Sequence, residues 1–578
     1  MTELIRDTVF GHLLRLLSGG RLLPYAEDRD PALWKKYVNE EASGRLAHHG
    51  HLERHGTESD TEDRPIEGIG IAKREENGLP LADSSPSDSS DLAFNEASGV
   101  KVDPEKGKDY NVVDWFGPDD PENPLNWSHT KKVFVTAEIC LLTFSVYIGS
   151  AIYSAGEMSV MKHFGVSQVA ATLGLTLFVL GYAVGPMIWS PMSEIPQIGR
   201  NPIYIATLFV FVCFQIPTAL AVNFGMLLAF RFLCGFVGSP ALATGGASIA
   251  DMYVPRKRAY GITIWGIAAV NGPVLGPLVG GFAAQAESWR WPIWELMWLS
   301  GGTLILLIFF LPETSPSNIL YRRARRLRKL TGNDKLKCAA EIASDSMTGK
   351  DVAVMMLVRP LTLNFTEPIV LLLNLYIALI YGLLYIWFES FPLVFEGIYK
   401  FNLGENGLAF LGILIGAVLV VPPFFLYLYY VQEKQFNDKG ELKPEYRLPP
   451  AFVGSICIPI CLFWFGWTSR ASIHWIVPII GSGLYSIGAF LLFNSVLNYL
   501  PDAYPEYAAS VLAGNDLMRA SFGAGFPLFA TAMYKNLGIG WASTLLALLG
   551  VVFIPIPFAL YYYGEPIRMR SKHARKDF

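Results

Sequence analysis

The sequence predicts an all-α membrane protein with twelve transmembrane helices in two bundles of six. Hydrophobic residues make up 52% of the 578 residues and charged residues only 17%, whereas soluble domains carry about 25% charged residues. From Lys131 onward, apolar stretches alternate with short polar loops. Each stretch is long enough for a helix to cross a bilayer core about 30 Å thick. A longer charged segment separates the stretches into two equal sets.

The chain is expected to have five parts. An acidic tail (1–130) precedes the first six helices (131–312), a cytoplasmic central loop (313–365) leads to the last six (366–563), and a basic tail (564–578) follows. The helices are expected at residues 133–155, 168–189, 203–222, 226–248, 260–283, 291–311, 368–390, 407–430, 450–468, 473–498, 508–532 and 540–562. Two six-helix halves are typical of transporters whose substrate site lies between the halves near the bilayer midplane.

The acidic tail itself divides into two regions. It holds 14 Lys and Arg against 26 Asp and Glu, while the rest of the chain holds 32 against 24. Apolar residues at helical spacing with charges between them predict a short amphipathic helix over 2–18, and not a secretory signal. This helix lies either on the cytoplasmic leaflet or on the protein's own surface. Residues 40–110 are too polar to fold alone, and the four histidines between His48 and His55 are interpreted as solvated tail.

Basic residues are unevenly distributed over the loops. If both termini are cytoplasmic, the inside segments carry 25 Lys and Arg and the outside loops carry five. Positive charge accumulates on the cytoplasmic side of membrane proteins, so both termini are expected there. The basic residues form no long continuous face, so the expected partner is the lipid bilayer and not nucleic acid.

Several classes of site are excluded by the absence of their motifs. The six cysteines are scattered, with neither CxxC nor Cys/His spacing, so no metal site is expected. No Walker A loop, GxSxG elbow or HExxH pair is present, so we expect neither an enzyme nor an ATP-driven pump. A proton gradient is then the expected energy source, and no cofactor is expected.

Charged residues within the apolar stretches are functional candidates, because a charge at the bilayer centre costs about 2.5–3.5 kcal/mol. Arg231, in the fourth helix, acts either as a fixed cation in a polar cavity or as a side chain that reaches the outer headgroups. Glu138 and Glu389 are the candidates for carrying a proton, and a position at the membrane interface is the alternative for both. Asp516 and Arg519 lie three residues apart on one helix and are expected to pair.

Two further patterns concern helix packing and substrate contact. Glycines four residues apart in Gly272–Gly281, with two prolines, predict an interface on which the halves rock, although tight packing alone gives the same pattern. Tyr376, Tyr381 and Tyr385 recur at helical spacing in the seventh helix. They predict an aromatic cavity for lipophilic, often cationic molecules, and core packing or an interfacial aromatic belt is the alternative.

Several stretches resemble a known family. Asp119–Trp127 reads Asp-Asp-Pro-Glu-Asn-Pro-Leu-Asn-Trp, and Ser190–Glu194 followed by Gly199 and Arg200 resembles a gating loop between the second and third helices. This loop departs from the family pattern by two extra residues and by Asn201 in place of a basic residue. Further matches are Arg231 with Gly235, Gly272–Gly281 (with Thr263 in place of a more distant glycine), Leu311–Thr314, and Ala513–Arg519 with Phe526–Phe529.

In this order, these stretches resemble the major facilitator superfamily, and within it the fungal twelve-helix drug:proton antiporters of the benomyl/methotrexate and fluconazole resistance group. The resemblance implies a monomeric exporter that exchanges protons for drug-like molecules across the plasma membrane, with the vacuolar membrane as the alternative. A sugar-type facilitator or symporter, or a membrane sensor that does not transport, are the alternative functions.

Together, the patterns and the resemblance give the expected site. Proton coupling is assigned to Arg231, Glu138 and Glu389, and cytoplasmic gating to Glu194, Gly199, Arg200 and Asp251; Asp251 can equally form a structural ion pair with nearby basic residues. The antiporter motif comprises Gly272, Gly276, Pro277, Gly280 and Gly281, and the substrate cavity Tyr376, Tyr381, Tyr385, Asn271 and Asn515.

Overall fold

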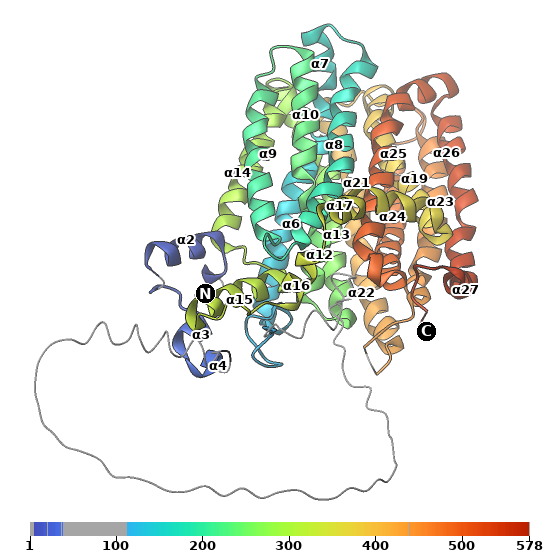
Figure 1. Ribbon diagram of the computed structural model, residues 1–578. Helices are drawn as coiled ribbons and strands as arrows, with labels where there is room; N and C mark the ends of the chain where they lie inside the picture. The colour runs from blue at the N-terminus through green and yellow to red at the C-terminus, as the bar shows by residue number, and fades with distance from the viewer. Residues whose placement is uncertain (1–4, 20, 36, 38–111, 439, 577–578) are drawn as a thin grey trace, which may run out of the picture.

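The computed structural model describes residues 5–19, 21–35, 37, 112–438 and 440–576. Long helices dominate these residues and gather in two bundles that lie side by side (Figure 1). Residues 2–4 of the expected amphipathic helix, the polar region 40–110 and the histidines between His48 and His55 lie outside the described residues.

The first bundle is built from helices of the first half of the chain. Its members are α6 (His129–Ala151) with α7 (Glu157–Phe164), α8 (Gln168–Glu194), α9 (Asn201–Ala219), α10 (Phe224–Gly238) with α12 (Gly245–Met252), α13 (Pro255–Ala286) and α14 (Trp291–Phe310). Hydroxyl and amide side chains cap several of these helices: Ser128 accepts from Lys131 N, Ser167 from Ala170 N and Asn223 from Met226 N. The helix starts therefore follow from local sequence.

The second bundle repeats this arrangement. It consists of α19 (Pro368–Phe391), α20 (Leu403–Ala409) with α21 (Leu411–Leu419) and α22 (Val421–Tyr430), α23 (Pro449–Thr468), α24 (Ile476–Ala503), α25 (Ala508–Leu537), and α26 (Ile539–Phe553) with α27 (Pro555–Arg570). Within the described residues, eleven helical spans are long and apolar enough to cross a membrane. The twelfth is α25, which carries Asp516, Arg519 and Lys535 and packs mainly against α19 and α8. Asp516 and Arg519 pair inside the protein and Lys535 is exposed near the end of the helix, so the lower hydropathy of α25 agrees with the predicted all-α membrane fold.

The first transmembrane span is interrupted near its C-terminal end. Helix α6 stops at Ala151, a short 3₁₀ turn (Ser154–Gly156) follows, and α7 continues to Phe164. Gly165 then ends α7 with a φ of 67°, a left-handed conformation that glycine adopts without strain. The span is thus longer than the apolar stretch 133–155, because α7 carries polar residues that hydropathy alone does not assign to it.

The central loop is more ordered than its charge suggests. It contains α15 (Pro316–Thr331), α16 (Ala339–Asp345), α17 (Gly349–Ala353) and α18 (Arg359–Thr366). The arginine run lies on α15, whose apolar side (Ala324 and Leu327) packs with Val113 and Leu336. At the same end of the bundles lie the N-terminal helices α2 (Val9–Leu17), α3 (Ala26–Arg29) and α4 (Ala32–Lys35), as does the C-terminal end of α27 (Figure 1).

Helix α2 contacts the protein itself. The ring of Phe10 lies 4.7 Å from that of Phe309 on α14, and Glu313 N donates to Asp7 O. The outer side of α2 nevertheless leaves Leu16 and Leu17 more than 70% exposed. Contact with the protein surface is therefore present, and an apolar side remains outward.

A largely buried group of five charged residues, here called the clasp, joins three distant parts of the chain. Its members are Glu27, Asp120, Glu122, Arg323 and Arg326. Arg323 contacts Asp120 at 2.6 Å and Glu122 at 3.2 Å, while Arg326 contacts Glu122 at 3.0 Å and also Glu27. Burial alone would raise the pKa of Asp120, but its bonds with Arg323 lower this pKa below its usual value.

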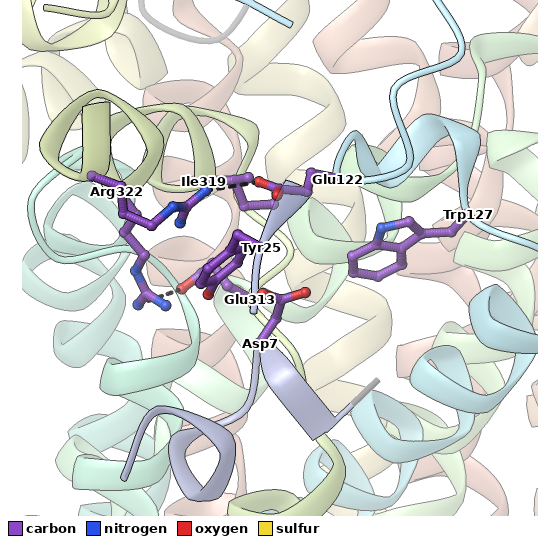
Figure 2. Close-up of a pocket in the computed structure, with 8 residues that line it drawn as sticks. Asp7, Tyr25, Glu122, Trp127, Glu313, Ile319 and Arg322 are labelled. Carbon is purple, nitrogen blue, oxygen red and sulfur yellow. Dashed lines mark hydrogen bonds and ion pairs between the residues drawn. The ribbon is translucent and has the colours of Figure 1, made fainter. Parts of the chain in front are cut away.

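The ring of Tyr25 lies beside the clasp, with the Arg326 guanidinium 3.6 Å from its centroid. Figure 2 shows Tyr25 close to Glu122, Glu313 and Arg322 in the small pocket between the N-terminal segment and α15. Arg322 and Glu313 approach to 3.7 Å there. The basic run of the central loop thus serves internal contacts.

Candidate functional site at the interface of the two bundles

Four buried tyrosines meet where the bundles face each other. Tyr147 (α6) and Tyr182 (α8) come from the first bundle, and Tyr381 and Tyr385 (α19) from the second. The Tyr182 hydroxyl lies 2.5 Å from that of Tyr381 and 2.8 Å from that of Tyr385, and Tyr147 also hydrogen-bonds to Tyr381. This tyrosine cluster is a buried polar contact between the two bundles.

A buried ion pair borders the tyrosine cluster. Asp516 and Arg519 on α25 pair at 2.6 Å, as the sequence predicts. The Arg519 guanidinium lies 5.4 Å from the ring centroid of Tyr381. The Arg519 charge thus lies within cation–π range of the tyrosine cluster.

Sequence reasoning found only half of the cluster. Tyr381 and Tyr385 are members, whereas Tyr376 packs against Phe553 inside the second bundle, at 5.3 Å between ring centroids. Asn515 donates to Asn374 at 2.8 Å and belongs to the same bundle. The opposing Tyr147 and Tyr182 were missed. In the sequence, these two tyrosines are marked only by a hydroxyl group within an apolar stretch. Separately, Asn271 lies on α13 next to Gly272, with its side-chain oxygen buried.

Arg231 is buried within the first bundle, with 1% of its surface exposed, so it does not reach toward the outer headgroups. Its guanidinium donates to the carbonyls of Gly149 (2.8 Å), Gly174 (2.8 Å) and Ser150 (3.3 Å). Gly149 and Ser150 belong to the last turn of α6, directly before the interruption of the first span. Arg231 therefore fixes the position of the interruption, and Ser150 in turn accepts from Tyr385 at 2.9 Å.

The two expected proton carriers lie in different surroundings. Glu389 on α19 accepts from Thr531 of α25 at 2.9 Å and lies 3.4 Å from the Thr172 hydroxyl of α8. Glu138 lies nearer the start of α6 with 3% of its surface exposed, and both of its carboxyl oxygens lack a hydrogen-bond partner among the described residues. Both side chains are thus buried, and Glu389 lies at the contact between the bundles.

The expected gating residues converge where α8 ends, α9 begins and α12 ends. Arg200 contacts Asp251 through two hydrogen bonds, of 2.6 and 3.3 Å. Burial would lower the pKa of Arg200, but the Asp251 carboxylate more than offsets this and the pKa is raised. Glu194, at the end of α8, is close enough to Arg200 to act on it electrostatically.

Glu313 completes this group, and sequence reasoning did not assign it. Its carboxylate accepts from the backbone N–H groups of Arg200 (3.1 Å) and Asn201 (3.2 Å) at the start of α9. Gly199 has a φ of 80°, and a Cβ there would lie 2.6 Å from Glu313 Oε2, so glycine is required for two reasons. Glu313 thus ties the end of the sixth span to the gating loop.

The glycines of the antiporter motif face two partners. A Cβ added at Gly272 or Gly276 would lie 2.9 Å from Tyr147 Cβ or 2.7 Å from Ile152 N, and Gly280 also packs on Ile152. A Cβ on Gly281 would lie 2.6 Å from Leu403 O in the other bundle. Likewise, a Cβ on Gly407 of the second bundle would lie 2.6 Å from Pro277 O. The motif therefore packs α13 closely against α6 in its own bundle and α20 in the other.

Comparison with known proteins agrees with this architecture. A model of the Major Facilitator Superfamily matches residues 139–527. "Transporter mfs1" of Schizosaccharomyces pombe is 49% identical over 84% of this chain and 94% of its own length. "Fluconazole resistance protein 1" of Saccharomyces cerevisiae is 43% identical over 83% and 88%. "Cycloheximide resistance protein" of Candida maltosa is 41% identical over 83% and 89%.

A solved structure of the proton:xylose symporter XylE shares the fold, with a TM-score of 0.51 and 15% identity over 76% of this chain and 96% of that one. The family model covers more than half of the chain, and the two helix bundles described above have the architecture of that family. This chain belongs to the major facilitator superfamily.

Proposed function

We propose that this protein exports lipophilic, drug-like or toxic small molecules from the cell in exchange for protons. Relatives that are more than 40% identical over more than 80% of the chain are named for resistance to fluconazole and to cycloheximide. The observation that carries the proposal is the contact between the bundles, which is made of tyrosine hydroxyls beside a buried cation. Such a surface binds varied amphiphiles through contact area and polarisable rings.

Alternating access requires that the contacts at the centre and at both ends of the bundles form and break in turn. The tyrosine cluster closes the centre, and at the cytoplasmic end Lys257 Nζ of α13 contacts Glu433 of the second bundle at 2.7 Å. At the outer end, Gly404 N donates to Gln285 Oε1 at 3.0 Å. Substrate contact is assigned to the tyrosine cluster, because its side chains come from both bundles and meet between them. Asn271 is assigned with it, because its buried side-chain oxygen has no hydrogen-bond partner among the described residues.

Proton coupling is assigned to buried carboxyl groups. Glu138 and Glu389 are the proposed proton carriers, because a buried carboxyl group gains or loses a proton when its access to water changes. Arg231 holds the interrupted span in position for this exchange. The proton gradient supplies the energy, so the protein needs no cofactor and catalyses no covalent reaction.

The protein is proposed to act as a monomer in the plasma membrane, with both termini in the cytoplasm. The distribution of Lys and Arg over the loops supports this orientation, since 25 lie on one side and five on the other. The described N- and C-terminal segments lie at the same end of the bundles, as this orientation requires (Figure 1).

The test is accumulation of a labelled azole or a fluorescent amphiphile in efflux-deficient yeast. Cells expressing the wild type should accumulate less than cells with an empty vector, and a protonophore should remove the difference. Arg231→Ala should also remove it at equal surface expression, because three carbonyls would lose their buried donor. If a panel of amphiphiles accumulates equally with and without the protein at the cell surface, drug export is wrong.

A further inference from the structure

A second carboxyl group lies against Glu389, contributed by the other bundle. Glu157, the first residue of α7, accepts from the Thr172 hydroxyl at 3.1 Å, and Glu389 lies 3.4 Å from the same hydroxyl. The two carboxyl groups therefore meet at one hydroxyl, and the second oxygen of Glu157 has no hydrogen-bond partner among the described residues. Both are buried, with 7% and 6% of their surfaces exposed. A hydrogen bond between two carboxyl groups requires a proton on one of them, because two carboxylates are acceptors only.

No cation forms an ion pair with either carboxyl group among the residues that the structure describes. Arg231 acts on Glu157 electrostatically, but its guanidinium is occupied by three backbone carbonyls. The Tyr153 ring lies beside the pair, and its hydroxyl donates to Ala171 O. Two buried carboxylates without a paired cation would repel each other in a medium of low dielectric constant.

A chain of polar side chains leads from the outer surface to the pair. The exposed Lys535 contacts Gln168 at 3.4 Å, and Gln168 donates to Thr531 at 3.2 Å. Thr531 then donates to Glu389 at 2.9 Å. These side chains come from α8 and α25, which belong to different bundles. The pair is therefore connected to the outer surface along the line where the bundles meet.

We propose that Glu157 and Glu389 form one proton-binding site, which holds the outer ends of the bundles together while the two carboxyl groups share a proton and lets them separate when that proton is lost. The bond that forms is a single O–H···O contact between the bundles, and the proton that completes it enters from water on the outer side. This proposal rests on the proposed function. It adds Glu157 as a proton-binding residue and the outer side as the side from which the proton enters.

The direction agrees with exchange of inward protons for outward substrate. With the outer side open, the pair takes up a proton and the outer side closes. When the proton leaves, repulsion between the carboxylates reopens the outer side. Arg231 is a positioning residue in this scheme, because it fixes the last turn of α6 and thereby the place where α7 begins.

The experiment is hydrogen–deuterium exchange of the purified full chain in lipid nanodiscs, without drug, from about pH 5 to about pH 9, a range that spans the titration of buried carboxyl groups. The reporters are peptides covering residues 157–172 and 389–400. In the wild type, after correction for intrinsic exchange, these peptides should be protected at acidic pH and lose protection as the pH rises.

Glu157→Gln and Glu389→Gln each replace the shared proton by an amide donor. Both variants should therefore stay protected over the whole range. Glu396→Gln is the matched control, because Glu396 lies at the outer end of the same span as Glu389 but contacts Asn406 of its own bundle. It should keep the wild-type profile. The two test residues lie on different helices, so if one variant fails to fold, the other variant still tests the proposal.

The proposal is overturned if both Gln variants retain the wild-type pH dependence, or if Glu396→Gln abolishes it equally. The outcome is separate from that of the yeast assay. If the wild type exports drugs but the opening of its outer side does not depend on Glu157 and Glu389, only the proposed proton-binding site is disproved. If the outer side of the wild type opens as the pH rises but the protein exports no amphiphile, only the drug-export proposal is disproved.

Discussion

Arg323 and Asp120 form a fully buried ion pair, 2.6 Å between Nη1 and Oδ2, that joins the segment before the first span to the helix after the sixth. In the sequence, all helices of the first bundle lie between these two residues. Because Glu122 and Glu27 add two more carboxylates and Arg326 a second guanidinium, the clasp ties the N-terminal segment and the central loop into one layer at the end of this bundle.

Removal of Arg323 should loosen this layer. Arg323→Ala leaves Asp120 and Glu122 buried without their shared cation, and loss of one partner from a buried pair costs about 3–5 kcal/mol. The expected results are a lower melting temperature and faster proteolysis of residues 112–127. Arg325→Ala is the control, because Arg325 is exposed on the same helix. Equal behaviour of the two variants would contradict a structural role for the clasp.

Docking of α2 should weaken in acid. His12 is half-buried, and its Nε2 lies 2.6 Å from Nη1 of Arg322. Burial, and secondly the Arg322 charge, lower the pKa of His12 from 6.5 to about 4. Between these pH values the undocked segment binds more protons than the docked one, so docking weakens as the pH falls from about 6.5 to about 4. Full protonation would cost docking about 3 kcal/mol.

Hydrogen exchange of residues 5–18 against pH measures this effect. His12→Gln keeps an acceptor for Arg322 but does not titrate, so the variant should remain docked to lower pH than the wild type. Neighbouring carboxyl groups contribute equally to both proteins and cancel in the comparison. A wild type and a variant with the same pH profile would show that His12 does not control docking.

A side chain at Gly281 should hold the outer ends of the bundles apart. Gly281→Val places a Cβ 2.6 Å from Leu403 O, a backbone atom that cannot rotate away. Overpacking of this kind costs about 1–3 kcal/mol. We expect loss of export and faster hydrogen exchange over residues 403–409. Gly266→Val on the same helix has no atom within 4 Å of the new Cβ and should behave like the wild type. Normal export by Gly281→Val would exclude this contact from the transport cycle.

The tyrosine cluster should control both closure and substrate profile. Tyr182→Phe removes hydrogen bonds to Tyr381 and Tyr385, each worth about 0.5–1.5 kcal/mol. The variant should therefore show an altered order of resistance across a panel of azoles and cationic dyes. Tyr376→Phe removes the same atom from a ring that packs inside one bundle and should leave that order unchanged. The assignment fails if the two variants share the same altered profile.

Much of the fold could be predicted because lipid imposes a simple pattern. A helix that crosses the hydrocarbon core must be apolar over about 20 residues, so hydropathy located the spans and the central loop before any contact was known. The first span shows the limit. Hydropathy ended it at residue 155, and Glu157 was overlooked as an intramembrane acid, because the polar α7 continues the span beyond the apolar stretch.

The sequence by itself determined the number of spans, the spans to which Arg231 and Glu389 belong, and the glycines of α13. Only the tertiary structure decided which buried side chains meet. Tyr147 and Tyr381 are more than 200 positions apart, and Thr172 and Glu389 are similarly distant, so their contacts depend on how each helix is rotated and shifted against its neighbours. Apolar composition constrains that rotation weakly, because lipid and protein interior favour the same side chains.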